Sequence, residues 1–216
     1  MKITQPLFSH TVSPFICVLA FNLAGCGEQA VAGKTGTTAP AVKVKEFTKD
    51  EHLAHLQKKA EAGNAEAQFK LGWIYVHGEG FTGVAFVRDI PKDAAKGFEW
   101  YQKAAAQEHV NAQYNLGMLY KLGLGMKEDA EKAFMWLQKA AAQGNDIAQY
   151  NLGVMYAEGA GVKPSLPRAC AWLTLAAAQG NGKAQKNYFE IEAKLTPAQR
   201  DEGRQLAAKW KKGDVL

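Results

Sequence analysis

Apolar residues in the middle of the chain recur with the spacing of amphipathic helices. One set lies three and four residues apart, which places its members on a single face of a 3.6-residue turn. This set consists of Ala148, Leu152, Met155 and Tyr156. A second set with the same spacing consists of Ala133, Trp136, Leu137, Ala140 and Ala141. Gly159 and Gly161 follow the first set, and glycine favours helix ends because it readily adopts the left-handed conformation. The pattern predicts helices that pair as hairpins.

The hairpin pattern is repeated along the chain. Trp100, Trp136 and Trp172 lie 36 residues apart, and a series of Ala-Gln pairs keeps the same interval. Small residues such as Gly117 and Gly153 would let two helix backbones approach closely. A hairpin of this length cannot bury its apolar face alone, so successive hairpins must stack. We therefore expect an all-α protein, an α-solenoid of stacked helical hairpins.

One period runs Ala-Gln-Tyr-Asn-Leu-Gly-x-x-Tyr-x-x-Gly-x-Gly and then Ala-x-x-Trp-x-x-x-Ala-Ala-x-x-Gly. This order resembles the Sel1-like repeat, a relative of the tetratricopeptide repeat with a similar helical hairpin. The resemblance implies a repeat domain over 47–212 that begins with a partial repeat. Its three full repeats are expected at about 64–108, 109–144 and 145–180.

The sequence departs from a strict repeat in two places. The first repeat is longer than the others, with the additional residues at 81–89. In the third repeat, Cys170 and Leu175 stand where the second repeat has Phe134 and Lys139.

Both ends of the repeat domain carry signals for capping helices. Thr48 followed by Glu51 is a capping box, in which the hydroxyl and the carboxylate satisfy backbone N–H groups at a helix start. Thr196 is followed by Pro197 and Gln199, which repeats this logic with proline at the first helical position. Solenoids need such polar-faced ends to stay soluble.

Residues 1–25 are typical of a secretory signal. Residues 15–25 form an apolar run too short to span a bilayer, and Leu23-Ala24-Gly25-Cys26 resembles the bacterial lipoprotein signal. The resemblance implies that Cys26 is lipidated and anchors the protein to the membrane. Residues 26–46, rich in Gly, Thr, Ala and Pro, are then a flexible tether. The alternatives are an ordinary cleaved signal with a chance cysteine and an uncleaved anchor.

The tether also bears on localisation. Gly27 follows the lipidated position, and enteric-type lipoproteins with a residue other than aspartate there are sorted to the outer membrane. By this resemblance we expect an outer-membrane protein that faces the periplasm.

Charge and cysteine content narrow the function further. The net charge of +5 is modest and spread along the chain, whereas nucleic-acid binding needs a denser basic face, so we expect no nucleic-acid partner. Of the three cysteines, Cys17 leaves with the signal and Cys26 carries lipid, which leaves Cys170. We expect Cys170 to be a small buried hydrophobe and not a redox or catalytic group.

Three patterns resemble chemical sites without meeting their requirements. Residues 78–83 match the dinucleotide glycine pattern, but a helix and not a strand precedes them, and the first two glycines belong to the repeat. His52 and His55 lie one turn apart, yet no third ligand is in phase, which favours a solvated helix face over a metal site. No nucleophile, base and acid arrangement stands out. We expect no enzyme activity, no metal and no small-molecule cofactor.

The remaining candidates lie on the first helix of each repeat and in the insert. By resemblance to tetratricopeptide arrays, the first helices line a concave groove that receives a peptide, and the expected contact residues are Lys70, Trp73, Asn115, Met118 and Asn151. The asparagines would bind a peptide backbone, or alternatively pack within the array. Phe81 and Phe86 in the insert form a second candidate contact, and the alternative is a hairpin folded back on the first repeat.

Together these features predict a lipid-anchored envelope adaptor that binds a protein or peptide in its groove. The alternative from another class is an envelope enzyme or a cell-wall or β-lactam binder of the cysteine-rich Sel1-like type. Those relatives carry paired cysteines in each repeat, which this chain lacks. A purely structural envelope role is the third possibility.

Overall fold

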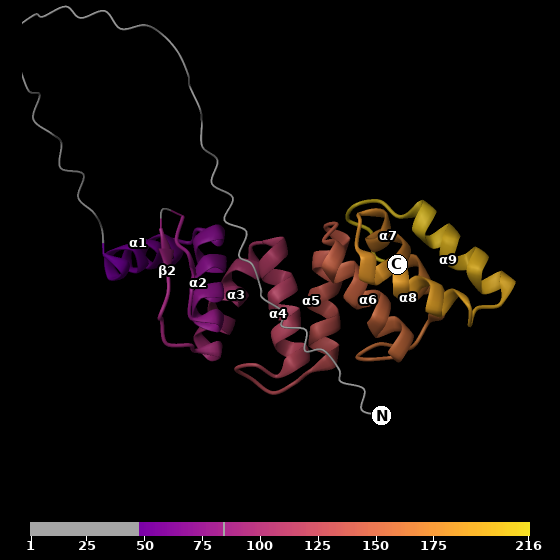
Figure 1. The fold of residues 1–216 in the computed structure, drawn as a ribbon, viewed down its shortest axis with the longest axis horizontal. Coiled ribbons are helices and arrows are strands. Elements are labelled where there is room, and N and C mark those ends of the chain that lie inside the picture. The colour runs from indigo at the N-terminus through magenta and orange to yellow at the C-terminus, as the bar shows by residue number, and fades with distance from the viewer. Residues whose placement is uncertain (1–47, 84) are drawn as a thin grey trace, which may run out of the picture. The chain divides into compact units, whose positions relative to one another are not determined.

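The computed structural model describes residues 48–83 and 85–216, and this part of the chain contains nine α-helices and one two-stranded hairpin. The expected signal, lipidation site and tether lie outside the described residues. Figure 1 shows the helices following one another as an array of stacked hairpins, which confirms the all-α solenoid. The helices are α1 (Lys49–Glu61), α2 (Ala65–His77), α3 (Ala94–Ala106), α4 (Val110–Leu122), α5 (Ala130–Ala142), α6 (Asp146–Glu158), α7 (Leu166–Ala178), α8 (Gly182–Glu192) and α9 (Pro197–Lys209).

Side-chain caps begin the helices where the sequence places them. Thr48 and Thr196 each close a complete capping box at the starts of α1 and α9, as expected. The repeat helices α2, α6 and α8 start at asparagine caps, whereas α4 starts at His109. Gly159 ends α6 in the left-handed conformation with φ of 74°. Local sequence signals therefore set the helix boundaries.

Each repeat is a hairpin of two helices in close contact: α2 with α3, α4 with α5, and α6 with α7. A glycine in the first helix permits this contact. A Cβ atom on Gly117 would lie 2.8 Å from Leu137 Cγ, and one on Gly153 would lie 2.6 Å from Leu173 Cγ. Leucine from the second helix thus packs directly on the backbone of the first, as the small residues predicted.

The core runs through the array in three buried clusters. The first joins α1, α2 and the insert around Leu71 and Ile74, and the second joins α3 and α4 around Tyr101. The third and largest extends from α5 to the start of α9 and includes Trp172. Each cluster bridges neighbouring hairpins, which explains why a single repeat would not be stable alone.

The insert forms an antiparallel hairpin of β1 (Gly80–Phe81) and β2 (Phe86–Val87), in which Phe81 pairs with Phe86. Val87 is 2% exposed and belongs to the first core cluster, so the hairpin folds back on the first repeat. Phe81 and Phe86 nevertheless remain 53% and 54% exposed. The segment is therefore a hairpin folded back on the first repeat, and the contact role of the two exposed phenylalanines stays a prediction.

The last hairpin departs from the repeat, because α9 packs against α7. Phe189 of α8 stands where Gly153 stands in α6, so the close helix contact available in the earlier repeats is blocked. In α9, a Cβ on Gly203 would lie 3.2 Å from Cys170 Cβ, and Trp210 forms an edge contact with Trp172 at 6.2 Å. A small residue at position 170 is required for this approach, which explains the cysteine that replaces phenylalanine there.

Among the described residues, no helix has both the length and the apolar character needed to cross a bilayer.

Candidate partner-binding surface

The first helices of neighbouring repeats contact one another, since α2 contacts α4 and α6 contacts α8. Their outward side chains therefore share a surface. We call this surface, on the first helix of each hairpin (α2, α4, α6 and α8), the A-helix face. Phe69 of α2 stacks on His109 at the start of α4, with ring centroids 4.7 Å apart. Asn187 of α8 donates to the Tyr150 hydroxyl of α6 at 3.4 Å. Polar and aromatic contacts thus connect one repeat to the next along this face.

His109 connects two repeats in a defined tautomer. Its Nδ1 accepts a hydrogen bond from the backbone N–H of Ala112 at 3.2 Å, which caps α4. Nδ1 must then be unprotonated, so Nε2 carries the hydrogen and donates to Glu66 at 3.0 Å. The sequence reasoning missed this residue, although a histidine at a capping position held by asparagine in other repeats was a visible signal.

A small cleft opens at the first repeat between α2 and the insert. It has a volume of about 170 Å³ and is lined by Phe69, Lys70, Trp73 and Phe81. We call it the aromatic cleft. It brings together two groove candidates, Lys70 and Trp73, with one insert candidate, Phe81, which the sequence had assigned to separate contacts. A three-sided aromatic wall with one cation offers both apolar burial and cation–π contact.

The side chains of the cleft are held in place by their neighbours. Trp73 is 41% exposed, and its ring stacks on His77 at 3.8 Å. The Lys70 ammonium lies 6.0 Å from the centre of the Phe81 ring and 3.2 Å from a Glu66 oxygen. The pKa of Glu66 is lowered by its hydrogen bond from His109 and by Lys70, so this carboxylate is charged near neutral pH. Lys70 is therefore oriented between an acidic and an aromatic neighbour.

The other groove candidates lie deeper. Asn115 donates to the Tyr101 hydroxyl at 3.1 Å, and Asn151, only 8% exposed, donates to the carbonyl of Ile147 at 2.8 Å. Both amides thus serve the array itself, which favours the packing alternative for them. Met118 is partly buried against the largest core cluster. The exposed part of the predicted groove is its N-terminal end.

The glycine pattern at 78–83 does not have the geometry of a dinucleotide site. Gly78 is the left-handed end residue of α2, and the chain then enters the β1–β2 hairpin. A nucleotide site requires the opposite arrangement, in which a strand leads into a helix N-terminus. Within the described part of the chain, no group of three or more His, Cys, Asp or Glu side chains is placed to hold a metal ion.

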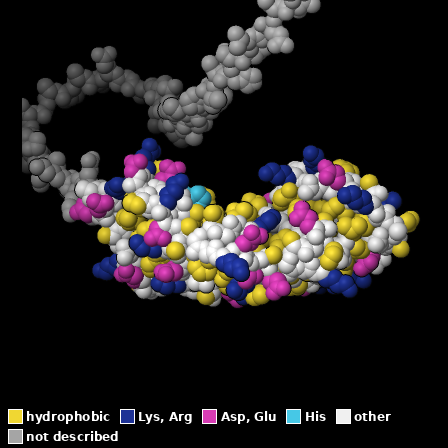
Figure 2. All heavy atoms as spheres, turned by 90° about the horizontal axis from the view of Figure 1, so that it is seen from below, with side chains coloured by type: hydrophobic (Ala, Val, Ile, Leu, Met, Phe, Trp, Pro, Cys, Tyr) yellow, Lys and Arg dark blue, Asp and Glu magenta, His cyan; other side chains and the backbone are white. Residues whose placement is uncertain are grey.

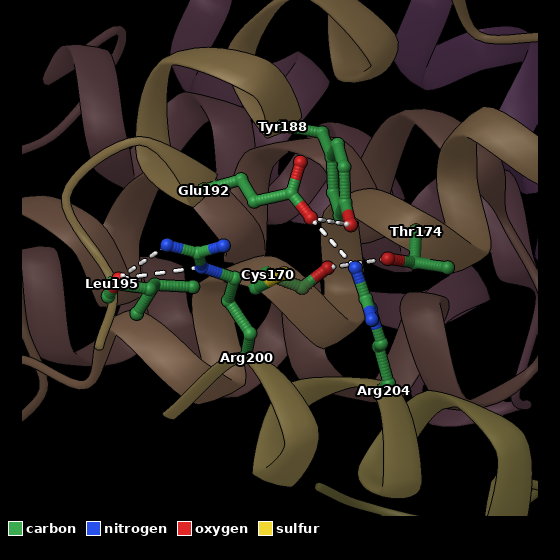
Figure 3. A network of polar contacts seen from close by, with 7 residues as sticks. All are labelled: Cys170, Thr174, Tyr188, Glu192, Leu195, Arg200 and Arg204. Carbon is green, nitrogen blue, oxygen red and sulfur yellow. Dashed lines mark hydrogen bonds and ion pairs between the residues drawn. The ribbon is translucent and has the colours of Figure 1, made fainter. Parts of the chain in front are cut away.

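Cys170 lies under a polar network that connects α8 to α9 (Figure 3). Tyr188 and Arg204 both donate to one Glu192 oxygen, at 2.8 Å and 3.0 Å. Burial, and secondarily the negative charge of Glu192, raise the pKa of the Cys170 thiol. The thiol is thus kept protonated and a poor nucleophile, consistent with a packing role.

The face of the molecule seen in Figure 2 carries charges of both signs. Lys and Arg side chains are interspersed with Asp and Glu side chains there, with hydrophobic areas between them. On this face the basic side chains do not form the dense stripe that is typical of nucleic-acid binding.

Comparison with known proteins agrees with this architecture. The Sel1 repeat model matches residues 65–109, 110–145 and 146–181. These matches extend over more than half of the sequence, and the chain belongs to the Sel1 repeat family.

Two solved structures are similar to the array. One is c5321, described as a protective antigen present in uropathogenic Escherichia coli strains displaying an SLR fold, with 32% identity over 76% of this chain and a TM-score of 0.66. This chain spans 33% of the length of that protein. The other is a Sel1 repeat protein from Oxalobacter formigenes, with 33% identity over 64% of this chain and 97% of its own, and a TM-score of 0.55. Among curated protein sequences, no match was found.

Proposed function

We propose that this protein is a non-catalytic adaptor of the bacterial envelope, which binds a protein or peptide partner through the N-terminal end of its A-helix face. Sel1-repeat folds commonly serve as protein-interaction scaffolds, which supports this class of function. The lipid on Cys26 would hold the array at the outer membrane on its periplasmic side. The fold then localises a partner and leaves its chemistry unchanged.

The aromatic cleft is the observation that carries the proposal. Aromatic residues are enriched in the buried centres of protein interfaces, and tryptophan is among the residues that most often dominate the binding energy. Trp73 and Phe81 would cover an apolar side chain of the partner, and Lys70 would face a partner carboxylate or backbone carbonyl. A recess of about 170 Å³ has room for one apolar side chain of the partner.

The hairpin supplies a matched pair of variants for testing this site. Phe81 and Phe86 face each other across the two strands and are almost equally exposed, but only Phe81 lines the cleft. In-cell crosslinking followed by affinity capture should recover a partner with the wild type and with Phe86→Ala. Recovery should fall with Phe81→Ala and with Trp73→Ala. Equal recovery by all four proteins would rule out the cleft as the contact.

Membrane attachment is tested separately. Metabolic labelling with a fatty acid should mark the wild type and be absent from Cys26→Ser, because the thiol is the acylated group. Label that persists in the variant would contradict lipidation at this cysteine. Covalent labelling of the purified protein by a β-lactam would instead support the enzyme or cell-wall alternative.

A further inference from the structure

Residues 210–216 fold back over the array, and we call this segment the strap. The backbone N–H of Gly213 donates to the carbonyl of Ala142, the last residue of α5, at 2.7 Å. The hydroxyl of Tyr156 on α6 donates to the carbonyl of Leu216 at 3.2 Å, and the Leu216 side chain packs against the largest core cluster. The strap therefore follows the groove between α5 and α7, with one hydrogen bond at its middle residue, Gly213, and one at Leu216.

The groove between α5 and α7 has apolar residues where it contacts the strap. Trp172 is fully buried under Trp210, and Leu175 lines the same recess as Trp210 and Lys212. One repeat earlier, the residue in the place of Leu175 is Lys139, whose ammonium lies 4.4 Å over the Trp136 ring. In α5 the Lys139 side chain covers Trp136, whereas in α7 the strap covers Trp172 and the corresponding residue is Leu175.

The groove one repeat earlier, between α3 and α5, has the same two contact points. Ala106 holds the place of Ala142, and Tyr120 holds the place of Tyr156. The Tyr120 ring meets Phe98 edge-on at 5.3 Å and lies under Lys132 at 5.5 Å. The corresponding values for the Tyr156 ring are 5.3 Å to Phe134 and 5.8 Å to Arg168. The surroundings of the tyrosine are therefore the same in both grooves, whereas Lys139 stands in the second groove where Leu175 stands in the first.

In this second groove both contact points lie beside open space. A recess of about 440 Å³ includes Ala106 in its lining, and one of about 360 Å³ includes Tyr120. Val215 of the strap is 59% exposed and lines the first recess. The strap thus presents an apolar side chain to the neighbouring groove, and that groove continues a surface on which the strap is already bound.

We propose that the α3/α5 groove is a second docking site, which binds a peptide segment of a partner that turns as the strap does and carries an apolar residue after the turn. A backbone N–H of the segment donates to the Ala106 carbonyl, and a backbone carbonyl three residues later accepts from the Tyr120 hydroxyl. An apolar side chain of the segment packs beside Val215. The site is separate from the aromatic cleft and does not depend on the proposed function of that cleft.

A labelled copy of the strap is the natural probe. The synthetic peptide Trp-Lys-Lys-Gly-Asp-Val-Leu, with a fluorophore at its N-terminus, is titrated with the full-length protein, and fluorescence anisotropy is followed. Saturable binding is expected. Loss of one hydrogen bond in Tyr120→Phe should weaken binding by about three- to tenfold, and Ala106→Trp, which fills the recess at an exposed position, should abolish it.

Tyr156→Phe is the matched control, because the same hydroxyl is removed from the groove that the strap already occupies. Binding that requires the Tyr156 hydroxyl and not that of Tyr120 would mean that the probe only exchanges with the strap, and would overturn the proposal. Absence of saturable binding would overturn it as well. Trp73→Ala should leave peptide binding unchanged, which separates this site from the aromatic cleft.

Discussion

The side-chain amide of Gln179, at the end of α7, donates a hydrogen bond of 2.8 Å to the side-chain oxygen of Gln149 in α6. Gln149 is fully buried, and its own amide donates to the carbonyl of Ala141 in α5 at 3.2 Å. One glutamine thus joins three successive helices. It also gives a further donor to the Ala141 carbonyl at the end of α5, which accepts from the backbone N–H of Gly144 at 2.9 Å.

The same bridge recurs in each earlier repeat. Gln113 accepts from Gln143 at 2.9 Å and donates to the carbonyl of Ala105, while Gln68 accepts from Gln107 at 2.7 Å and donates to the carbonyl of Ala60. A buried polar ladder therefore runs beside the apolar core. Because each rung has both partners, it fixes the register of neighbouring hairpins without leaving an unsatisfied polar group.

Breaking one rung should destabilise the array. Gln149→Ala removes the acceptor of the Gln179 amide and one donor to the Ala141 carbonyl, and each hydrogen bond contributes about 0.5–1.5 kcal/mol. We expect a loss of about 2 kcal/mol in the free energy of unfolding, measured by urea denaturation. Gln185→Ala is the control, since Gln185 holds the same repeat position in α8 but is exposed. Equal effects of the two substitutions would contradict the role of the ladder.

The sequence predicted this fold through its periodic residues. The tryptophan and glycine intervals predicted the hairpins, and the Thr48 capping box predicted the first helix start. The Ala-Gln pairs were visible as a repeat, but the role of the glutamines in joining three helices was missed. The hydrogen-bond partners of a buried glutamine lie on other helices, and the sequence does not show which helices pack together. Single-chain patterns report local structure well and contacts between elements less well.

Residues that break the repeat were visible in the sequence, but the structural reason for them could not be predicted. Cys170 and Leu175 were visible departures, yet their reason lies in α9 and the strap, which have no counterpart elsewhere in the chain. The aromatic cleft was likewise split into two candidates, because only the fold of the β1–β2 hairpin brings Phe81 next to Trp73. These features depend on tertiary contacts of segments that occur once in the chain, and the repeat pattern cannot predict such contacts.

The close helix contact within each repeat should not tolerate a larger residue. In Gly153→Ala the new methyl group would lie 2.6 Å from Leu173 Cγ, so the two helices would have to separate. Overpacking of this kind costs about 1–3 kcal/mol of unfolding free energy. Gly182→Ala is the matched control, because a Cβ there meets nothing within 4 Å. Thermal unfolding of both variants would show the difference, and an unchanged melting temperature for Gly153→Ala would refute the contact.

The Cys170 thiol should be inert in the folded protein. It is 1% exposed, and burial raises its pKa, so both access and thiolate content are low. We expect reaction with a thiol reagent only after addition of denaturant, at a rate that follows unfolding. The measurement uses a variant with both Cys17→Ser and Cys26→Ser, so that Cys170 is the one cysteine in the sequence. Rapid labelling of Cys170 under native conditions would show that α9 opens away from α7.

The contact between the first two repeats should weaken in acid. The pKa of Glu66 lies below its usual value of 4.5, mainly because His109 donates a hydrogen bond to it. A carboxyl whose pKa is lowered by folding stabilises the folded state above its unfolded pKa, and that stabilisation disappears as pH falls through the folded pKa. Wild type should therefore be more stable than Glu66→Gln at pH 7, and the difference should shrink as pH falls below 4.5 and vanish below the folded pKa of Glu66. Urea denaturation at a series of pH values measures the stability of both proteins.

Glu99→Gln, which changes an exposed carboxylate on α3, controls for the loss of one negative charge. A difference between wild type and Glu66→Gln that grows on acidification would contradict the assigned link, since only an ionised Glu66 can hold both His109 and Lys70.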